Sequence, residues 1–450
     1  MIRIKSTIPG IAWPAVPNPG GAAILAALFQ LEHSQWWPPA QHWARQREQL
    51  GPLLRHAVGT CPYYSTALRA AVLALPNDFS EEQFKTLPFL RRADLQRHHA
   101  EIKTNAPIKE HGRMHSGVTS GSTGEPVHYT TNELTAFFWQ AINLRDHIWH
   151  RRDFSRKLVA IRASAQGDSM RNWFGAVGET TLATGPCVQI PMNTSTEEQA
   201  RAVIAEDPAY LTGYPNNLAG VLEQVDRLGG ELPGLMQLRT FGEAVTEAFR
   251  TYVKQRWKVP LVDLYSTREA GYLALQCPDS EDYHIQSEVA YVEVLDDRNL
   301  PCGPGETGRM VITSLHNFAF PLIRYELGDY AEVGGLCSCG RGLPVIRRIL
   351  GRSRNLMKLR DGRMLWPVFG TPKFLKIAPI RQFQIVQRSY EELELRFAVE
   401  RDLTADEKNR LGVHILETLG HRFRLTWTFV PEIAHDKGGK FEEFMRAFDD

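Results

Sequence analysis

The sequence predicts an α/β protein with two domains, on three observations: its length, an alternation of strands and helices in its middle, and strand-rich sequence after that. A chain of 450 residues is too long for one ordinary hydrophobic core and is expected to divide. Between about residues 157 and 266, short apolar runs alternate with amphipathic segments, which is typical of a mostly parallel sheet flanked by helices. We therefore expect a large N-terminal domain with mixed, mostly parallel sheets flanked by helices plus a β-subdomain, and a small mobile α+β C-terminal domain.

The N-terminal part of the chain predicts helices with recognisable starts. Apolar residues recur at helical spacing over residues 40–72. Ser80 is followed three residues later by Gln83, which is the pattern of a capping box. Asn132 stands where it would cap a helix over residues 133–150.

Strands and helices then alternate. Ser195 and Glu198 have the spacing of a second capping box, and paired glycines stop the helix after it. The expected strands are residues 157–163, 209–215, 238–244 and 260–266, and the expected helices are residues 195–207, 220–230 and 246–257.

The pattern changes after about residue 284. Three strand-like segments follow one another without helices between them, and a polar break occurs at residues 351–355. Beyond the break, residues 381–399 predict a hairpin, residues 404–423 a capped helix and residues 424–433 a strand. The expected domains are therefore 1–352 and 353–450.

Composition limits the classes of function. Apolar residues make up 43% of the chain and charged residues 23%, as in globular proteins. Lys and Arg (52) nearly balance Asp and Glu (51), which argues against a nucleic-acid partner or an anionic membrane. Prolines interrupt the N-terminus and the apolar run at 22–29 is short, so we expect neither a signal peptide nor a membrane span. Six cysteines are too few for a disulfide scaffold, and we expect a cytoplasmic location.

A polar, glycine-rich loop occupies residues 116–132. Its glycines permit close approach of backbone to a ligand, and its N–H groups and hydroxyls are donors for phosphate oxygens. The loop matches neither G-x-x-x-x-G-K-[ST] nor G-x-G-x-x-G, so the residues alone leave open a phosphate-binding loop and a flexible surface loop. Glu125 stands where a lysine would be expected. Phosphate would repel its carboxylate by roughly 1 kcal/mol, so we expect its side chain to point away.

Four residues have the chemistry of a metal site. Cys337 and Cys339 lie in a C-x-C pair, and Cys277 lies seven residues before His284. Thiolate and imidazole ligands suit tetrahedral Zn²⁺. The spacing leaves a structural zinc site and a set of reduced loop cysteines both open.

Six short motifs follow one another along nearly the whole chain. They are TSGSTGEP at 119–126, GEA at 242–244, YSTRE at 265–269, PLIRYELGDYAEV at 321–333, GR at 351–352 and GGKF at 438–441. Each motif is weak alone, but their order is specific. In this ordered set the sequence resembles the adenylate-forming ligase superfamily, and within it the phenylacetate–CoA ligase branch with its CapK-like relatives.

The resemblance implies a role for each motif. Lys440, Thr267 and Glu269 would be catalytic: Lys440 a mobile cation for the adenylation step, Thr267 (or Ser266) a donor to the α-phosphate, and Glu269 a ligand for Mg²⁺. Asp329 would bind the ribose hydroxyls. The remaining nucleotide-binding residues would be Thr119, Ser120, Gly121, Ser122, Thr123, Gly124, Gly242, Glu243, Tyr265, Ser266 and Arg352. Some relatives carry a similar Cys/His arrangement, which favours the zinc site.

The resemblance also implies a function. The chain would use ATP to activate a small carboxylic acid to an acyl-adenylate, release pyrophosphate and transfer the acyl group to CoA. Tyr214, Trp173 and Phe174 lie where the family binds its acid, and their rings suit an aromatic acid, although aromatic residues also pack in cores. A carrier-protein thiol or an amine remains open as acceptor, and a non-catalytic nucleotide- or acyl-binding protein is a further alternative. The hinge, usually an acidic pair after Gly-Arg, is Arg354–Asn355 here, which weakens the inference of a rotating C-terminal domain.

Overall fold

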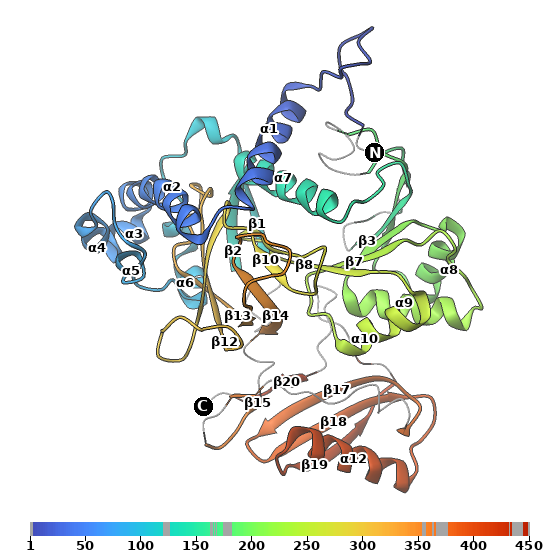
Figure 1. Ribbon diagram of the computed structural model, residues 1–450. Helices are drawn as coiled ribbons and strands as arrows, with labels where there is room; N and C mark the ends of the chain where they lie inside the picture. Colours follow the sequence, from blue (N-terminus) through green and yellow to red (C-terminus); the bar gives the residue numbers. More distant parts are fainter. Residues whose placement is uncertain are drawn as a thin grey trace. The chain divides into compact units, whose positions relative to one another are not determined.

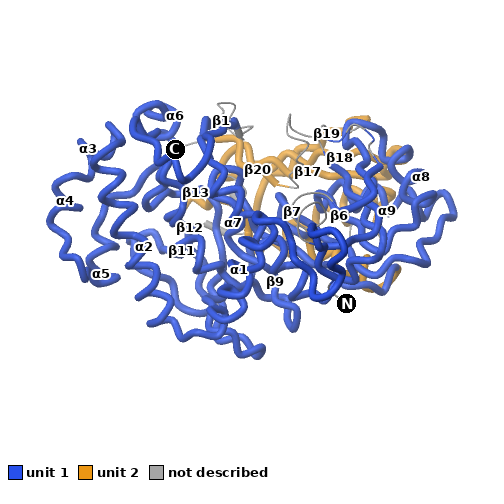
Figure 2. The backbone as a smooth tube through the Cα atoms, turned by 90° about the horizontal axis from the view of Figure 1, so that it is seen from above, with its two compact units in different colours: residues 1–245, 257–349 blue, residues 246–256, 350–450 orange. Residues whose placement is uncertain are grey.

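The computed structural model divides the chain into two compact units (Figure 2). One unit comprises residues 1–245 and 257–349, and the other comprises residues 246–256 and 350–450. The structure describes residues 3–119, 127–162, 165, 167, 169–173, 182–352, 357–361, 364–365, 377–431, 433 and 444–448.

Helices form the N-terminal part of the first unit. Pro39–Thr60 is one helix, and the turn at Cys61 separates it from two short helices. The capping box at Ser80 is confirmed, since its hydroxyl accepts from the backbone N–H of Gln83. The helices are α1 (Pro19–Ser34), α2 (Pro39–Thr60), α3 (Pro62–Ala67), α4 (Arg69–Ala74), α5 (Glu81–Phe84) and α6 (Arg92–Ile102), with a 3-10 turn at Lys109–His111.

A β-hairpin and a long helix follow. Strand β1 (Met114–Thr119) pairs antiparallel with β2 (Val127–Asn132). Asn132 ends β2 and caps α7 (Glu133–Trp149), because its side-chain oxygen accepts from the N–H of Thr135. The predicted cap is confirmed, and it fixes where the helix leaves the hairpin (Figure 1).

A twelve-stranded sheet runs through the first unit, in the order β11-β12-β13-β14-β10-β9-β8-β7-β6-β3-β5-β4. The stretch from β5 to β8 is parallel, as the alternation of strands and helices predicts. The Ser195 capping box of α8 is also confirmed. The elements of this half are β3 (Leu158–Arg162), β4 (Ser169–Met170), β5 (Cys187–Pro191), α8 (Thr196–Glu206), β6 (Tyr210–Gly213), α9 (Pro215–Arg227), β7 (Gln237–Phe241) and β8 (Leu261–Thr267).

The other half of this sheet is antiparallel. The change begins at Gly271, where β9 returns beside β8, and so earlier than the sequence pattern indicates. The later strands extend the same sheet, so the expected β-subdomain is continuous with the parallel part. Its strands are β9 (Gly271–Gln276), β10 (Tyr283–Ile285), β11 (Ala290–Leu295), β12 (Thr307–Ser314), β13 (Tyr325–Val333) and β14 (Val345–Arg352).

The second unit contains a four-stranded sheet in the order β19-β18-β17-β20. Its hairpin and its helix match the predicted elements, and Thr404 caps the helix through a capping box with Glu407. The helix contributes Leu411 and Ile415 to the unit's buried core. The elements are α10 (Glu247–Tyr252), a π-helical segment that begins at Val253 and ends at Trp257 in the first unit, β15 (Met357–Lys358), β16 (Met364–Leu365), β17 (Ile380–Ser389), β18 (Glu392–Val399), α12 (Ala405–Leu419), β19 (Arg424–Phe429) and β20 (Phe444–Arg446). Among the described residues of the chain, no helix combines the length and the apolar character that crossing a membrane requires.

Candidate functional site

The stretch expected to be a loop over residues 116–132 forms strands at both of its ends, because β1 reaches Thr119 and β2 begins at Val127, and only residues 120–126 connect the two strands of the hairpin. Thr119 pairs with Val127, so residues 120–126 join directly paired strand ends. Two residues back from these strand ends, the ring of Tyr129 lies on Gly117, where a Cβ atom would be 2.3 Å from the ring. The hairpin therefore needs a glycine here. The predicted phosphate-binding residues Ser120, Gly121, Ser122, Thr123 and Gly124 lie outside the described residues, as does Glu125.

The turn after β8 brings the predicted magnesium ligand close to this hairpin. Arg268 Nη1 donates to the carbonyl of Val118 at 3.5 Å. Burial raises the pKa of the Tyr129 hydroxyl, and the charges of Arg268 and Glu269 both act on it. Two segments far apart in sequence thus converge, and the Glu269 carboxylate lies near the strands that carry the glycine-rich loop.

Thr267 closes the turn that carries Glu269. Its hydroxyl oxygen accepts from the N–H of Ala270 at 3.1 Å, which is the turn-capping role that a threonine at a strand end often has. Because the oxygen accepts here, the proton of the hydroxyl is not used in this bond. The chain then turns through Gly271, whose φ of +87° favours glycine, and the indole of Trp139 packs against it.

Tyr265 and Asp329 meet although their strands are not neighbours. The Tyr265 hydroxyl donates to Asp329 Oδ2 at 2.5 Å. Strands β9, β10 and β14 separate β8 from β13 in the sheet order, a distance of about 19 Å across a flat sheet. The sheet must therefore curl strongly, and this curl places the predicted ribose-binding carboxylate beside the aromatic residue of the YSTRE motif.

Arg324 supports β13 from within the protein. Its guanidinium pairs with Glu293 at 2.8 Å and 3.0 Å and also donates to the carbonyls of Lys85 and Leu87. Only 3% of the residue is exposed. These partners give Arg324 a supporting role in the packing before β13.

The GEA turn follows β7 and packs on Tyr214, the residue directly after β6. Gly242 has a φ of +81°, and a Cβ atom there would lie 2.8 Å from the ring of Tyr214. The Glu243 carboxylate accepts from the backbone N–H and the side-chain amide of Asn216, at 3.2 and 3.1 Å. Glu243 therefore anchors the turn to the N-terminus of α9. The ring of Phe241 lies 4.9 Å from that of Tyr214, so aromatic groups line this edge of the sheet.

The remaining predicted residues are placed as follows. Trp173 is buried, and its indole N–H donates to the carbonyl of Arg156. Arg352 ends β14, but its side chain lies outside the described residues, as do Phe174, Lys440 and the hinge pair. Ser266 lies at a register shift between β8 and β9.

The four predicted zinc ligands come together in the first unit. Their ligand atoms all lie within 4.8 Å of one another. Cys277 Sγ lies 3.7 Å from Cys337 Sγ, and Cys339 Sγ lies 3.2 Å from His284 Nε2. His284 Nδ1 faces the carbonyl of Leu343 at 3.4 Å, which favours the tautomer with Nε2 free to bind a metal.

A buried cluster of charges that sequence reasoning missed lies beneath β6 and β7. Asp146 Oδ2 accepts from Arg152 Nη1 at 2.7 Å and from Arg239 Nε at 2.8 Å. Burial alone raises the pKa of Asp146, but the two arginines more than offset this and hold it well below its usual value. His147 Nδ1 lies 3.1 Å from Arg152 Nη1. A detectable signal was Arg239 itself, because a charged residue within a buried parallel strand needs an explanation.

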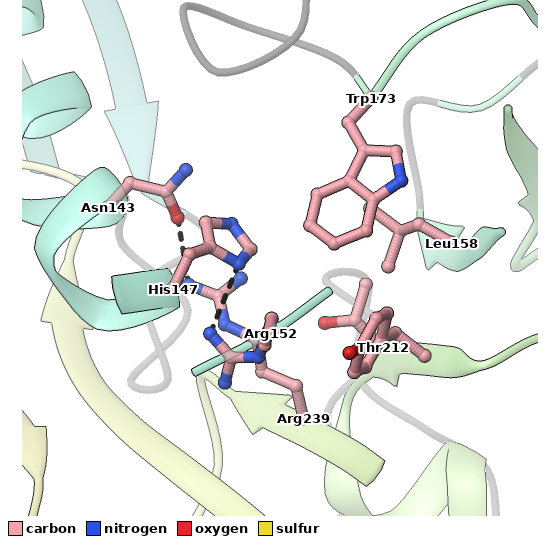
Figure 3. Close-up of a pocket in the computed structure, with 8 residues that line it drawn as sticks. Asn143, His147, Arg152, Leu158, Trp173, Thr212 and Arg239 are labelled. Atoms are coloured by element: carbon pink, nitrogen blue, oxygen red, sulfur yellow. Dashed lines mark hydrogen bonds between the residues drawn. The ribbon is translucent and has the colours of Figure 1, made fainter. Parts of the chain in front are cut away.

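These residues line a small cavity (Figure 3). Its volume is about 20 Å³, enough for one water molecule or one small polar group. The guanidinium groups of Arg152 and Arg239 lie on one side, and Trp173 and Thr212 lie on the other (Figure 3). The full lining is Asn143, His147, Arg152, Leu158, Trp173, Tyr210, Thr212 and Arg239.

Comparisons with known proteins agree with this architecture. No family model matches the chain. The phenylacetate–coenzyme A ligase of Escherichia coli is 26% identical over 407 residues, which cover 85% of this chain and 87% of that protein. The enzyme of the same name from Thermus thermophilus is 24% identical over 442 residues, which cover 89% and 96%.

Solved structures share the fold. A 2-hydroxyisobutyryl-CoA ligase in the postadenylation state superposes with a TM-score of 0.72 at 17% identity, over 92% of this chain and 91% of that chain. An anthranilate CoA ligase in complex with anthranoyl-AMP gives 0.51 at 16% identity, over 72% and 65%. Sequence similarity to these enzymes over most of the chain, together with the shared fold and the order of the motifs, supports the adenylate-forming superfamily and, within it, the phenylacetate–CoA ligase branch.

Proposed function

We propose that this protein is an AMP-forming acid–thiol ligase. In its first reaction, the carboxylate of a small acid attacks the α-phosphorus of ATP, and pyrophosphate leaves. In the second, the thiolate of CoA attacks the acyl carbonyl, and AMP leaves. The observation that carries the proposal is the convergence of three distant segments: the hairpin with the glycine-rich loop, the turn with Glu269, and the Tyr265–Asp329 pair.

The arrangement suits catalysis by positioning and charge neutralisation, which supply most of the rate in phosphoryl transfer. The hydroxyls and N–H groups of residues 119–124 would bind the β- and γ-phosphates. Glu269 would hold Mg²⁺, which would neutralise charge on the phosphate oxygens. Thr267 would donate to the α-phosphate with the proton that its turn bond leaves unused.

The nucleoside would bind where the curl of the sheet brings β8 and β13 together. Asp329 would accept from the ribose hydroxyls, and the Tyr265 hydroxyl would fix the orientation of that carboxylate through its 2.5 Å hydrogen bond. The turn at Gly242 and Glu243 would face the adenine. Glu243 acts there through its backbone, since its carboxylate accepts from Asn216. Lys440 and Arg352 would complete the charge around the α-phosphate.

The acid would bind beside the aromatic residues at the ends of β6 and β7. Tyr214 and Phe241 stand there, and Trp139 packs on Tyr272 at 4.8 Å. These rings support an aromatic acid.

A structural zinc ion would complete the first unit. With Zn–S of about 2.3 Å and Zn–N of about 2.0 Å, a tetrahedral site separates two sulfurs by about 3.8 Å and sulfur from nitrogen by about 3.5 Å. The observed 3.7 Å between Cys277 and Cys337, and 3.2 Å between Cys339 and His284, fit these values. The N–H of Asp279 donates to Cys277 Sγ at 3.4 Å, which favours a thiolate. All four ligand positions would be filled, so the ion would have no catalytic position.

Pyrophosphate exchange with purified protein over a panel of carboxylic acids tests the proposal. We expect acid-dependent exchange that Glu269→Gln lowers at least a hundredfold, and that Glu197→Gln, on the surface of α8, leaves unchanged. Acceptor assays with CoA, carrier protein and amines then identify the second substrate. Exchange without any acid, or full exchange in Glu269→Gln, would contradict the assignment.

A further inference from the structure

The cavity beneath β6 and β7 has an excess of positive charge. Arg152 and Arg239 face a single carboxylate, Asp146. Burial and the neighbouring arginines lower the pKa of His147 well below its usual value, so this imidazole is neutral at pH 7. The pKa of His150 is likewise lowered to about 4, chiefly by burial. One positive charge therefore remains uncompensated within the cluster.

The cavity also presents buried donors that lack partners. In the part of the chain that the structure describes, neither Arg152 Nη2 nor the hydroxyl of Thr212 has a hydrogen-bond partner. Arg152 is 5% exposed and Thr212 1%. Leaving such groups unpaired is costly. A cation and a hydroxyl directed at the same space are the donor set for a small anionic oxygen group.

Hydrogen bonds link Arg239 in the cavity lining to the aromatic residue Tyr272 through Asn143. Arg239 Nη2 donates to Asn143 Oδ1 at 2.8 Å, and the Tyr272 hydroxyl donates to the same oxygen at 3.1 Å. Thr212 precedes Tyr214 by two residues on the chain, a distance of about 7 Å along an extended backbone. The cavity lining at Thr212 therefore lies close in the chain to Tyr214, one of the aromatic residues beside which the acid is proposed to bind.

We propose that the acid activated by this protein carries a second anionic group, a carboxylate, which binds in this cavity to Arg152, Arg239 and Thr212. This inference rests on the proposed function and names its substrate class: a dicarboxylic acid, with an aliphatic chain or a benzene ring between its two carboxylates. The first carboxylate is adenylated near the Gly242 turn, and the second remains ionised in the cavity. A water molecule in the cavity is the competing occupant.

The test compares matched pairs of acids that differ only in the second carboxylate. The pairs are pentanoate with glutarate, hexanoate with adipate, and 4-ethylphenylacetate with 1,4-phenylenediacetate, so that a methyl group replaces the second carboxylate in each, and they are assayed by acid-dependent AMP release. We expect kcat/KM for the best diacid to exceed that of its partner at least tenfold. Equal or better use of the monoacids in every pair overturns the inference and leaves the proposed function intact.

Thr212→Val tests the site with the least disturbance to folding. It replaces an unpartnered hydroxyl with a methyl group of the same size, so the fold should be retained. We expect the diacid-to-monoacid ratio to fall about tenfold in this variant, as for loss of one hydrogen bond to a charged group. Thr418→Val, on the exposed face of α12, is the matched control and keeps the wild-type ratio. An unchanged ratio in Thr212→Val overturns the assignment.

Binding measured by calorimetry tests the anion site independently of adenylation. The same diacids are titrated into wild-type protein and Thr212→Val without nucleotide. If no acid supports AMP release, saturable diacid binding that is weakened about tenfold in Thr212→Val still supports an anion site, while the proposed function fails. Absence of diacid binding in that case overturns both.

Discussion

We expect Asp146→Asn to lower the stability of the fold, because two buried arginines lose their shared counter-ion. The substitution keeps the size of the side chain but removes the charge that Arg152 and Arg239 contact at 2.7 and 2.8 Å. Asp146 is fully buried, so water cannot replace the lost interaction. Breaking a buried pair by removing one partner costs about 3–5 kcal/mol, and here two cations lose the same partner. We therefore expect destabilisation of at least about 3 kcal/mol.

Urea unfolding, followed by tryptophan fluorescence, measures this loss. Glu197→Gln is the matched control, because it removes a contact of the same length, 2.8 Å to Arg201, between side chains that are 54% and 63% exposed. Exposed pairs contribute less than about 1 kcal/mol. Similar losses of stability in Asp146→Asn and Glu197→Gln would refute the reasoning, since burial would then make no difference.

The same carboxylate predicts a pH dependence. Its pKa in the folded protein is lowered, on balance, by Arg152 and Arg239. An acid whose folded pKa is depressed stabilises the protein above its unfolded pKa of about 3.9 and loses this contribution as the pH falls toward the folded value. In wild type we therefore expect a loss of stability below about pH 4, and in Asp146→Asn a smaller one. An equal loss of stability at acid pH in both proteins would mean that Asp146 does not contribute to that loss.

Three further predictions follow from the site. Tyr265→Phe removes the hydrogen bond to Asp329, and we expect KM for ATP to rise about tenfold with an unchanged circular dichroism spectrum; an unchanged KM would mean that this bond does not position the carboxylate. Lys440→Ala should abolish adenylation but spare thioester formation from supplied acyl-adenylate, while Lys437→Ala keeps both; normal pyrophosphate exchange in Lys440→Ala excludes its role. Protein purified without chelator should contain one zinc per chain, and Cys337→Ser should lose it and lower Tm; metal-free wild type would rule the site out.

Local sequence signals predicted the elements well. The caps at Ser80, Asn132, Ser195 and Thr404 all form as expected, because capping needs residues only three positions apart. The sequence pattern placed the change from parallel to antiparallel pairing too far along the chain. The reason is that β9 is as apolar as a parallel strand and its direction depends on the turn at Gly271.

Long-range features were harder to predict. The sequence identified Cys277, His284 and the C-x-C pair as a possible metal site, because thiol and imidazole have few other common roles in clusters. Nothing local indicated that Arg152 and Arg239 share Asp146. On a helix, an Arg-Asp-His run ordinarily marks a solvated face, and only the packing of α7 under the sheet buries it. The resemblance assigned Tyr265 and Asp329 to the nucleotide site, but their direct contact was not predicted, since it depends on the curl of the whole sheet.

The curl of the sheet has a consequence for synthesis of the chain. The contact between Arg268 and Val118 spans 150 residues, so at about 5–20 residues per second the ribosome needs about 8–30 s to supply the second partner after the first. During that interval the glycine-rich hairpin has neither the turn with Glu269 nor the strand with Asp329. Under the proposed function, nucleotide would therefore not stabilise the nascent N-terminal half, and we expect protection by ATP against proteolysis only after β13 has been made.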